Sequence, residues 1–421
     1  MAGLTPSAEN SHKGVHMAGN LTAVSLKEVG NQTAAAVDEG VEAALDLLGD
    51  PLQDIGKGDR VVIKPNMFQR KPGFRTSPEL LLALAKRASA RGAEVFIAER
   101  TQVLKEILLE HPVHRYAQVV SFDDRPLRIV QVPGARSLRV PIAVPDIVTE
   151  CDFFIGAPQL RTHSSVVFTN AMKNLVGLLP GFTTRIVHMA GVEESIVDLN
   201  QLRPQHLVVC DAMTVIEGNY PMEGSTREVG LIAASRNAVA MDVTMAAVAG
   251  VGAWELAYLQ DAAQRGLGPI DLADIEVRGV AVDDVAFTID RAPVTLTPPR
   301  EGIHVHADTA CEDCRRWLAA AMHRLRDELL AFPGELTIVS GPMERLPELR
   351  GAVVLVGNAL YEHREAGVYL EGCPPRAIQT AGIRHAMGHD VTDQERTQFR
   401  VPTRLSDDSR PLSWPAPEEL V

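Results

Sequence analysis

The feature that most constrains the fold of this chain is a repeated alternation of short apolar runs and amphipathic stretches. Residues 59–64 form an apolar run, residues 78–91 carry a leucine and alanine stripe at helical spacing, and residues 93–98 form the next apolar run. Ser77 can cap the intervening helix and Pro78 suits its first turn. This strand–helix–strand order predicts a βαβ unit within a largely parallel sheet.

The alternation continues until a proline-rich stretch, residues 291–301, interrupts it. Before the interruption, strands are predicted at 152–155, 207–211, 231–235 and 275–282, and helices at 26–48, 238–248 and 254–265. After it, helices are predicted at 311–331 and 375–387, and strands at 336–340, 352–356 and 368–371. We therefore predict an α/β protein, in which a mostly parallel sheet with flanking helices precedes a smaller C-terminal α/β domain.

The predicted boundaries follow from this alternation. They are a disordered N-terminus over residues 1–24, the first α/β domain over 25–288, a linker over 289–300, the cysteine-bearing C-terminal domain over 301–391 and a polar tail over 392–421.

The charge balance excludes some partners. The formal net charge is −13, whereas nucleic acids and anionic membranes attract basic surfaces. The longest apolar stretch, residues 238–254, contains Asp242, Gly250 and Gly252 and predicts a buried helix and not a membrane span. The first 20 residues lack the apolar core of a secretory signal, so we expect a cytoplasmic protein with reduced cysteines. A small anionic substrate remains compatible with this charge.

The densest group of polar residues follows the predicted strand at 152–155. Ligand sites of open α/β sheets lie outside the carboxyl ends of the strands. Cations in this group can neutralise a carboxylate or phosphate, and imidazoles can act as acid, base or metal ligand near neutral pH. We predict His163, Lys173 and His188 as catalytic residues. The predicted substrate-binding residues are Lys64, Asn66, Arg161, Thr169, Asn174, Gly177, Arg185, Asp211 and Glu217.

An ordinary polar surface loop is the alternative interpretation, but the concentration of His, Lys, Asn and Gly favours a binding site. Asp242 lies within an apolar helix, where an unpaired carboxylate is costly. It is therefore either a site residue or a buried carboxylate with structural partners.

These residues resemble the motifs of the domain of unknown function 362 family. That family typically shows a strand ending in Lys-x-Asn, then Lys-x-His, Thr-x-x-x-Lys-Asn-x-x-Gly, a later His, Asp-x-x-x-x-x-Glu-Gly and a late Asp. The corresponding residues are Lys64, Asn66, Arg161, His163, Thr169, Lys173, Asn174, Gly177, His188, Asp211, Glu217, Gly218, Gly224 and Asp242. Arg161 stands where lysine is usual, which keeps the charge but changes the geometry. The resemblance, over residues 61–251, implies the fold and the site; some members are associated with iron–sulfur clusters.

Three of the five cysteines are grouped near predicted helix starts. Cys311 and Cys314 form a CxxC at the start of one helix, and Cys373 precedes another. Helix N-termini stabilise thiolates, which are the metal-binding form of cysteine. We predict these three residues as metal ligands. Cys151 and Cys210 lie beside apolar strands and are expected to be small buried residues.

The nature of this centre has several alternatives. An iron–sulfur cluster, which we predict, usually takes four cysteines. The candidates for the fourth ligand are His304, His306, Asp308, Glu362, His363, water and substrate. The family resemblance implies a cysteine where this chain has Ala359. A zinc site completed by one histidine, a redox-active dithiol and no cofactor are the alternatives.

We expect an enzyme that acts on a small carboxylated or phosphorylated metabolite with the help of a metal or an iron–sulfur cluster. A lyase, isomerase or redox step in a biosynthetic pathway fits this site, and a redox partner is compatible with it. The alternatives are a non-catalytic iron–sulfur electron-transfer protein and a zinc-stapled interaction protein. The sequence defines no oligomeric state.

Overall fold

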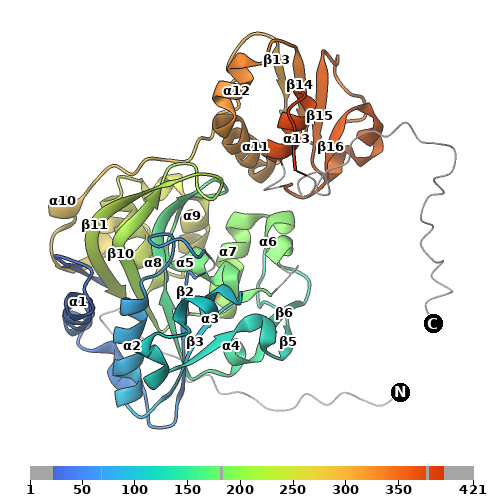
Figure 1. Ribbon diagram of the computed structural model, residues 1–421. Helices are drawn as coiled ribbons and strands as arrows, with labels where there is room; N and C mark the ends of the chain where they lie inside the picture. Colours follow the sequence, from blue (N-terminus) through green and yellow to red (C-terminus); the bar gives the residue numbers. More distant parts are fainter. Residues whose placement is uncertain (1–21, 68, 181–183, 376–378, 393–421) are drawn as a thin grey trace, which may run out of the picture. The chain divides into compact units, whose positions relative to one another are not determined.

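The structure is a computed structural model that describes residues 22–67, 69–180, 184–375 and 379–392. These residues divide into two compact units (Figure 1). The N-terminal unit contains residues 22–220 and Gly224–Ala292, and the C-terminal unit contains Pro221–Glu223 and residues 293–392. The predicted disordered N-terminus and the predicted tail lie outside the described residues, except for residues 22–24 and 392.

The N-terminal unit is built on a ten-stranded sheet with the order β12-β1-β11-β10-β7-β2-β3-β4, to which β8 and β9 are attached through β10. Its strands are β1 (Ala23–Glu28), β2 (Arg60–Pro65), β3 (Glu94–Glu99), β4 (Gln118–Ser121), β7 (Phe153–Ala157), β8 (Gln159–His163), β9 (Val167–Thr169), β10 (Leu207–Glu217), β11 (Ser225–Ser235) and β12 (Glu276–Gly279). A separate antiparallel ribbon contains β5 (Leu127–Val130) and β6 (Ile142–Pro145).

The centre of the sheet is parallel, as the sequence predicted. Strands β10, β7, β2, β3 and β4 run in the same direction, whereas β11 is antiparallel to both β1 and β10. The helices of this unit are α1 (Ala34–Asp46), α2 (Pro78–Ala90), α3 (Val103–Leu108), α4 (Asp146–Glu150), α5 (Ala171–Asn174), α6 (Thr184–Ala190), α7 (Val192–Leu202), α8 (Ala238–Val248), α9 (Ala257–Gln264) and α10 (Val282–Val285).

Both faces of this sheet are covered, which explains why its central strands are continuous apolar runs. On β2, Val61 and Ile63 pack into a core with α1 and α2, while Val62 packs into a second core on the opposite face. Helices α5, α7, α8 and α9 contribute to that second core (Figure 1). The result is a three-layer α/β/α arrangement, so the predicted α/β fold class is confirmed.

Helix starts follow the side-chain chemistry of the sequence. The Ser77 hydroxyl accepts a hydrogen bond from the amide of Glu79 at 3.2 Å, and Pro78 occupies the first turn of α2. Asn237 caps α8 by accepting from the amide of Ala240 at 2.9 Å. These caps satisfy amides that have no partner within their own helix.

Four predicted elements differ clearly from the structure. The predicted helix over 26–48 is wrong at its start, because residues up to Glu28 belong to β1, which pairs with β11 and β12, and α1 begins only after its cap, Thr33. The strands predicted at 207–211 and 231–235 are parts of a long β10–β11 hairpin. The single helix predicted over 311–331 is divided at Leu325, whose backbone leaves the helical conformation.

The C-terminal unit contains a four-stranded parallel sheet with the order β13-β14-β15-β16. Its elements are β13 (Ile303–His306), α11 (Glu312–Arg324), α12 (Arg326–Ala331), β14 (Leu336–Ser340), β15 (Ala352–Val356), the 3-10 segment η8 (Asn358–Ala366), β16 (Val368–Leu370) and α13 (Gln379–Ala386). Helices α11, α12 and α13 share one core with the sheet, and η8 contributes Leu360 to a smaller core. Within the described ranges, no helix is both long enough and apolar enough to cross a membrane.

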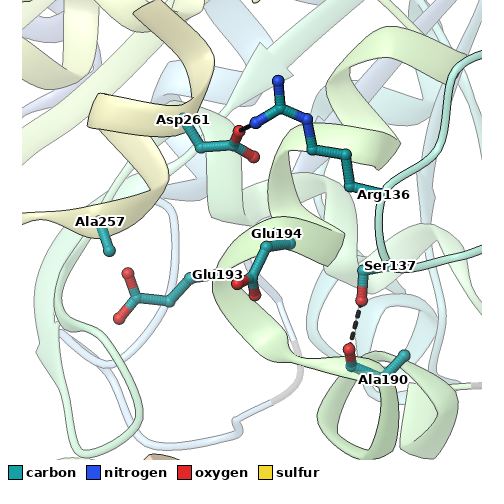
Figure 2. Close-up of a pocket in the computed structure, with 7 residues that line it drawn as sticks. All are labelled: Arg136, Ser137, Ala190, Glu193, Glu194, Ala257 and Asp261. Carbon is teal, nitrogen blue, oxygen red and sulfur yellow. Dashed lines mark hydrogen bonds and ion pairs between the residues drawn. The ribbon is translucent and has the colours of Figure 1, made fainter. Parts of the chain in front are cut away.

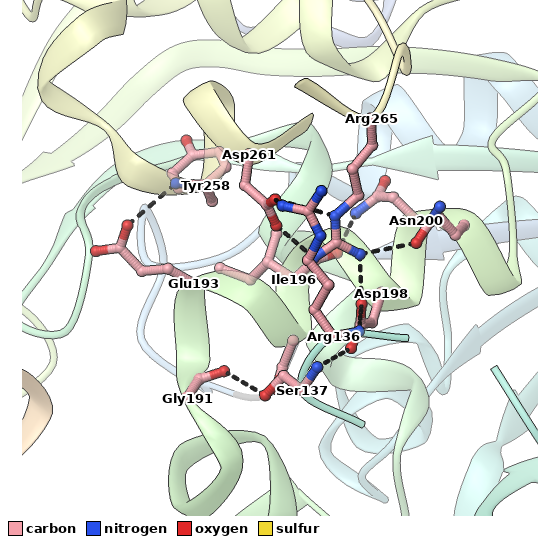
Figure 3. Close-up of polar contacts among 12 residues, drawn as sticks. Arg136, Ser137, Gly191, Glu193, Ile196, Asp198, Asn200, Tyr258, Asp261 and Arg265 are labelled. Carbon is pink, nitrogen blue, oxygen red and sulfur yellow. Dashed lines mark hydrogen bonds and ion pairs between the residues drawn. The ribbon is translucent and has the colours of Figure 1, made fainter. Parts of the chain in front are cut away.

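A buried carboxylate fastens a long loop to the helical layer of the N-terminal unit. Asp198 on α7 accepts hydrogen bonds from the backbone amides of residues 136–138 at 2.7–3.1 Å, and Arg265 donates to it at 2.5 Å. Figure 3 shows Asp198 between Ser137 and Arg265. Burial would raise the pKa of Asp198, but the hydrogen bonds from Arg265 and from these amides lower it below its usual value.

We expect Asp198→Ala to reduce the free energy of unfolding by about 3–5 kcal/mol, because it leaves three backbone amides without their acceptor and removes one of the two carboxylates paired with Arg265. The folded-state pKa of Asp198 is depressed, so the deficit should be complete at neutral pH and should shrink as the pH falls through that pKa. Urea unfolding at several pH values measures it. Glu106→Ala, which removes an exposed ion pair with Arg70, is the control and should unfold close to wild type. Equal stability of Asp198→Ala and wild type at pH 7 would contradict this assignment.

Candidate functional site

The site predicted from the sequence lies where the winding of the sheet reverses. From β2 the chain passes through α2 to β3 on one side, whereas the later strand β7 pairs with the other side of β2. In open α/β sheets, ligands bind outside the carboxyl ends of the strands at such a reversal. The motif residues Lys64 and Asn66 stand at the carboxyl end of β2, and Gln159 follows the end of β7.

A buried lysine occupies the centre of this edge. The side chain of Lys64 is fully buried, and its ammonium donates to the carboxylate of Glu99 at 2.8 Å, the carbonyl of Pro65 at 2.9 Å and the amide oxygen of Asn174 at 2.9 Å. An ammonium has three protons, and each has an acceptor here. Burial lowers the pKa of Lys64, whereas Glu99 raises it.

Two asparagines extend this network across the sheet. Asn66 donates to the side-chain oxygen of Asn174 at 2.8 Å and accepts from the backbone amide of Gln159 at 2.9 Å. The side-chain amide of Asn174 in turn donates to the carbonyl of Lys64 at 2.9 Å. The network therefore ties the ends of β2 and β3, the start of β8 and the helix α5 to one another.

Gly177 lies directly against this network. It belongs to the 3-10 turn η4 (Leu175–Leu178) that follows α5. A Cβ atom at residue 177 would lie 2.7 Å from the ammonium nitrogen of Lys64 and 3.0 Å from a carboxylate oxygen of Glu99. Glycine is required here because its backbone approaches two buried charged groups more closely than any side chain allows.

Cations outnumber carboxylates around Lys64. Arg161 and Arg100 both lie near enough for their charges to lower the pKa of Lys64, while Glu99 is the carboxylate bound to it. The guanidinium of Arg100 also hydrogen-bonds the hydroxyl of Thr184, which begins α6. This edge of an acidic protein therefore carries a local excess of positive charge.

The hairpin of β8 and β9 brings further motif residues to this end of the sheet. The guanidinium of Arg161 lies over the ring of Tyr220, with its carbon 5.2 Å from the ring centre, and His163 meets the same ring edge-on at 6.2 Å. Val167 in this hairpin has a φ of +62°, which is unusual for a β-branched residue. Backbone strain of this kind is concentrated at functional sites.

The three residues predicted to be catalytic differ in accessibility. His163 and Lys173 are partly buried, and His188 on α6 is buried. Arg185, on the same helix as His188, is exposed. Thr169 is buried at the end of β9. The catalytic and binding roles of these residues stay predictions.

Two predicted substrate-binding carboxylates have partners within the protein. Asp211 accepts from the backbone amides of Ser77 at 2.7 Å and Met213 at 3.1 Å, and burial raises its pKa to about 6. Glu217 accepts from the guanidinium of Arg227 at 2.9 Å and from the amide of Asp290 at 3.1 Å. Both carboxylates therefore connect segments of the N-terminal unit.

Of the two interpretations offered for Asp242, the structure supports a buried carboxylate with structural partners. It accepts from the amides of Ala171 at 2.7 Å and Met172 at 3.1 Å, at the start of α5, and burial raises its pKa to about 7. This contact fixes the helix that presents Lys173 and Asn174.

Neither Glu99 nor Gln159 is among the site residues predicted from the sequence. Glu99 ends an apolar strand and is 3% exposed, so a buried carboxylate at the carboxyl end of a parallel strand was the available signal.

A hollow of about 380 Å³ lies elsewhere in the N-terminal unit (Figure 2). It is lined by Arg136, Ser137, Ala190, Glu193, Glu194, Ala257 and Asp261. The cation of this lining, Arg136, forms an ion pair with Asp261, and two glutamates remain. The hollow is therefore acidic and does not suit the anionic ligand expected from the sequence.

The three cysteines of the C-terminal unit lie close together at the carboxyl ends of its strands. Cys311 is exposed at the cap of α11, Cys314 is buried in its first turn, and Cys373 follows β16. A hydrogen bond from Cys314 lowers the pKa of Cys311 to about 6. Burial raises the pKa of Cys373, and the charge of Cys311 raises it further.

A glycine leaves space beside these thiols. Gly357 follows β15 with a φ of +100°, and a Cβ atom there would lie 4.0 Å from the sulfur of Cys314 and 3.7 Å from the carbonyl oxygen of Gly372. The side chains of the described segments nevertheless form no group of three or more His, Cys, Asp or Glu residues that could hold a metal ion as they stand. Thiolates are suitable metal ligands, but Cys311, Cys314 and Cys373 do not by themselves form a complete metal site in this arrangement.

Comparisons with known proteins agree with the motif analysis. The family model described as "Domain of unknown function (DUF362)" matches residues 61–247. The thylakoid-associated protein sll1697 of Synechocystis sp. (strain ATCC 27184 / PCC 6803 / Kazusa) is 28% identical over 233 residues, which cover 52% of this chain and 72% of that protein.

Among solved structures, the lactate racemase apoprotein from Thermoanaerobacterium thermosaccharolyticum overlaps with 77% of this chain and 70% of its own, at 13% identity and a TM-score of 0.38. The resemblance inferred from the Lys-x-Asn and Lys-Asn-x-x-Gly motifs is confirmed by the family model and lies within the N-terminal unit. Residues 61–247 of this chain form a domain of the DUF362 family.

Proposed function

We propose that this protein is an enzyme that binds a small carboxylated or phosphorylated metabolite at the carboxyl end of β2 and β7. The observation that carries the proposal is the group of cations at the reversal point of the sheet, where Arg100 and Arg161 lie near the buried Lys64–Glu99 ion pair. Charges that are shielded from water act on a ligand more strongly than exposed ones. An anion that reached this edge would relieve the repulsion among the three cations.

The cations divide into two kinds. Lys64 donates all of its protons to the protein, so it contributes charge to the site and no ligand contact. The guanidinium of Arg161 donates to the hydroxyl of Tyr220 at 3.4 Å and lies over the same ring, and a guanidinium can bind a carboxylate or phosphate through two parallel hydrogen bonds. Arg161 is therefore our candidate for direct ligand contact.

Acid–base catalysis would come from the motif residues with imidazole and amine groups. The imidazoles of His163 and His188 can transfer protons near neutral pH, and Lys173 supplies an amine. A lyase, isomerase or redox step in a biosynthetic pathway matches this inventory.

The first experiment tests anion binding. Arg161→Gln should weaken the binding of inorganic phosphate or a small dicarboxylate about tenfold or more, because a charge-assisted hydrogen bond is worth about 1.5–3 kcal/mol. Isothermal titration calorimetry on the full chain measures the change. Arg128→Gln, on the exposed ribbon strand β5 and paired with Glu150, is the matched control and should bind like wild type. Absence of binding by wild type, or equal weakening in both variants, would remove the proposal.

The C-terminal unit is proposed to hold an iron–sulfur cluster through Cys311, Cys314 and Cys373. Support comes from three free thiols that are near enough for the charge of Cys311 to act on both Cys314 and Cys373, and from the space that Gly357 leaves beside Cys314. Such a cluster supplies one-electron transfer or a Lewis-acidic iron. The fourth ligand is left to a non-cysteine group, and a zinc site built on the same thiols is the second candidate.

Anaerobic purification followed by iron, sulfide and zinc analysis and a visible absorption spectrum tests this centre. Wild type should be coloured and contain iron and sulfide, whereas Cys373→Ser should lose most of both. Cys151→Ser, which alters a buried thiol of the N-terminal unit, should retain them. A colourless protein with about one zinc would replace the cluster with the zinc site, and a protein without any metal would end both assignments.

We propose the cytoplasm as the compartment. All five cysteines carry free thiols, which suits a reducing environment. The net charge of −13 opposes adsorption to an anionic membrane, although the cyanobacterial relative is named as thylakoid-associated.

A further inference from the structure

We propose that Glu99 is a positioning residue of the anion site: it holds Lys64 and the turn at Gly177 in place, and anion binding depends on it although it is itself a carboxylate. The inference rests on the proposed anion site. It concerns a residue outside the recognised motifs. It predicts that removal of the negative charge of Glu99 weakens anion binding, whereas charge alone would predict tighter binding.

Both oxygens of Glu99 are used within the protein. One accepts from the ammonium of Lys64 at 2.8 Å, and the other accepts from the backbone amide of Arg100 at 2.7 Å. The residue is 3% exposed, so no oxygen remains for a ligand. Glu99 therefore fixes the spacing between the carboxyl ends of the neighbouring strands β2 and β3.

The Lys64–Glu99 pair also supports the turn that follows α5. A Cβ atom at residue 177 would lie 2.7 Å from the lysine nitrogen and 3.0 Å from the second carboxylate oxygen, so the backbone of this turn passes the pair with no room for a side chain. Asn174, one turn earlier, accepts from the same ammonium. Displacement of either charge would move the segment that presents Lys173.

The neutral isostere of Glu99 cannot make these contacts. Two donors, the ammonium of Lys64 and the amide of Arg100, face the side chain of residue 99. Glutamine offers one carbonyl oxygen and one NH₂ group, so one of the two donors would meet another donor. The buried ammonium would lose its counter-ion, and an unpaired buried charge is strongly disfavoured.

The two explanations of Glu99 predict opposite outcomes. If Glu99 acted only through its charge, Glu99→Gln would make the edge more cationic and tighten anion binding. If Glu99 positions Lys64 and the Gly177 turn, the same change should weaken binding despite the added positive charge.

The test is a titration of inorganic phosphate into the full-length wild type, Glu99→Gln and Glu94→Gln. Glu94 is exposed at the opposite end of β3 and serves as the matched control. We expect Glu99→Gln to bind phosphate about tenfold or more weakly, with unchanged circular dichroism, and Glu94→Gln to match wild type. The pH profile adds a readout that a purely structural role would not move. Binding by Glu99→Gln should decline at a lower pH than binding by wild type, because Lys64 lacks its counter-ion.

A double variant decides the question if Glu99→Gln does not fold. Lys64→Met with Glu99→Leu removes both charges and leaves neither unpaired, a change that buried ion pairs often tolerate. It should fold and lose phosphate binding. Wild-type affinity in the double variant, or equal or tighter binding by Glu99→Gln, would overturn the positioning role while leaving the anion site intact. Failure of wild type to bind phosphate would instead count against the anion site itself and the inference that rests on it.

Discussion

The burial of the Lys64 ammonium is the constraint on which the arrangement of this domain depends. A charged group can be taken out of water only where every proton finds an acceptor. The three acceptors come from the strand end of Lys64 itself, from Glu99 on β3 and from Asn174 on α5. Elements far apart in the sequence are therefore required to meet at one point, and that point is where the winding of the sheet reverses.

This requirement gives a physical meaning to the family motif. The Lys-x-Asn and Lys-Asn-x-x-Gly segments supply partners for one another, since Asn66 and Lys64 both donate to Asn174 and Gly177 leaves room for the pair of charges. These residues build a scaffold that does not depend on a particular ligand. We propose that specificity depends on the more accessible residues, among them His163 and Lys173. A shared motif can thus be kept by proteins that act on different substrates.

The sequence alone predicted most of the helices and strands of this scaffold, but few of the hydrogen bonds and ion pairs that connect them. Local signals were sufficient for α8 and β14, whose predicted bounds agree with the structure, because continuous apolar runs and caps define such elements. They failed over residues 26–48. The end of strand β1, which is stabilised by pairing with β11, lies only a few residues before α1, and its apolar residues look like part of the apolar stripe of that helix. The partnership of Lys64 with Glu99 could not be predicted, because it depends on which strand lies beside β2.

The structure also explains how a chain with a net charge of −13 can maintain a cationic edge. Two buried carboxylates of the N-terminal unit are bound to backbone amides: Asp211 to the start of α2 and Asp242 to the start of α5. Burial raises their pKa values to about 6 and about 7, so a part of their negative charge is absent near neutral pH. Hydrogen bonds from amides and partial protonation together reduce the field of these groups at the strand ends. Glu99, bound to its lysine, then leaves the two arginines as the charges that an entering anion would meet.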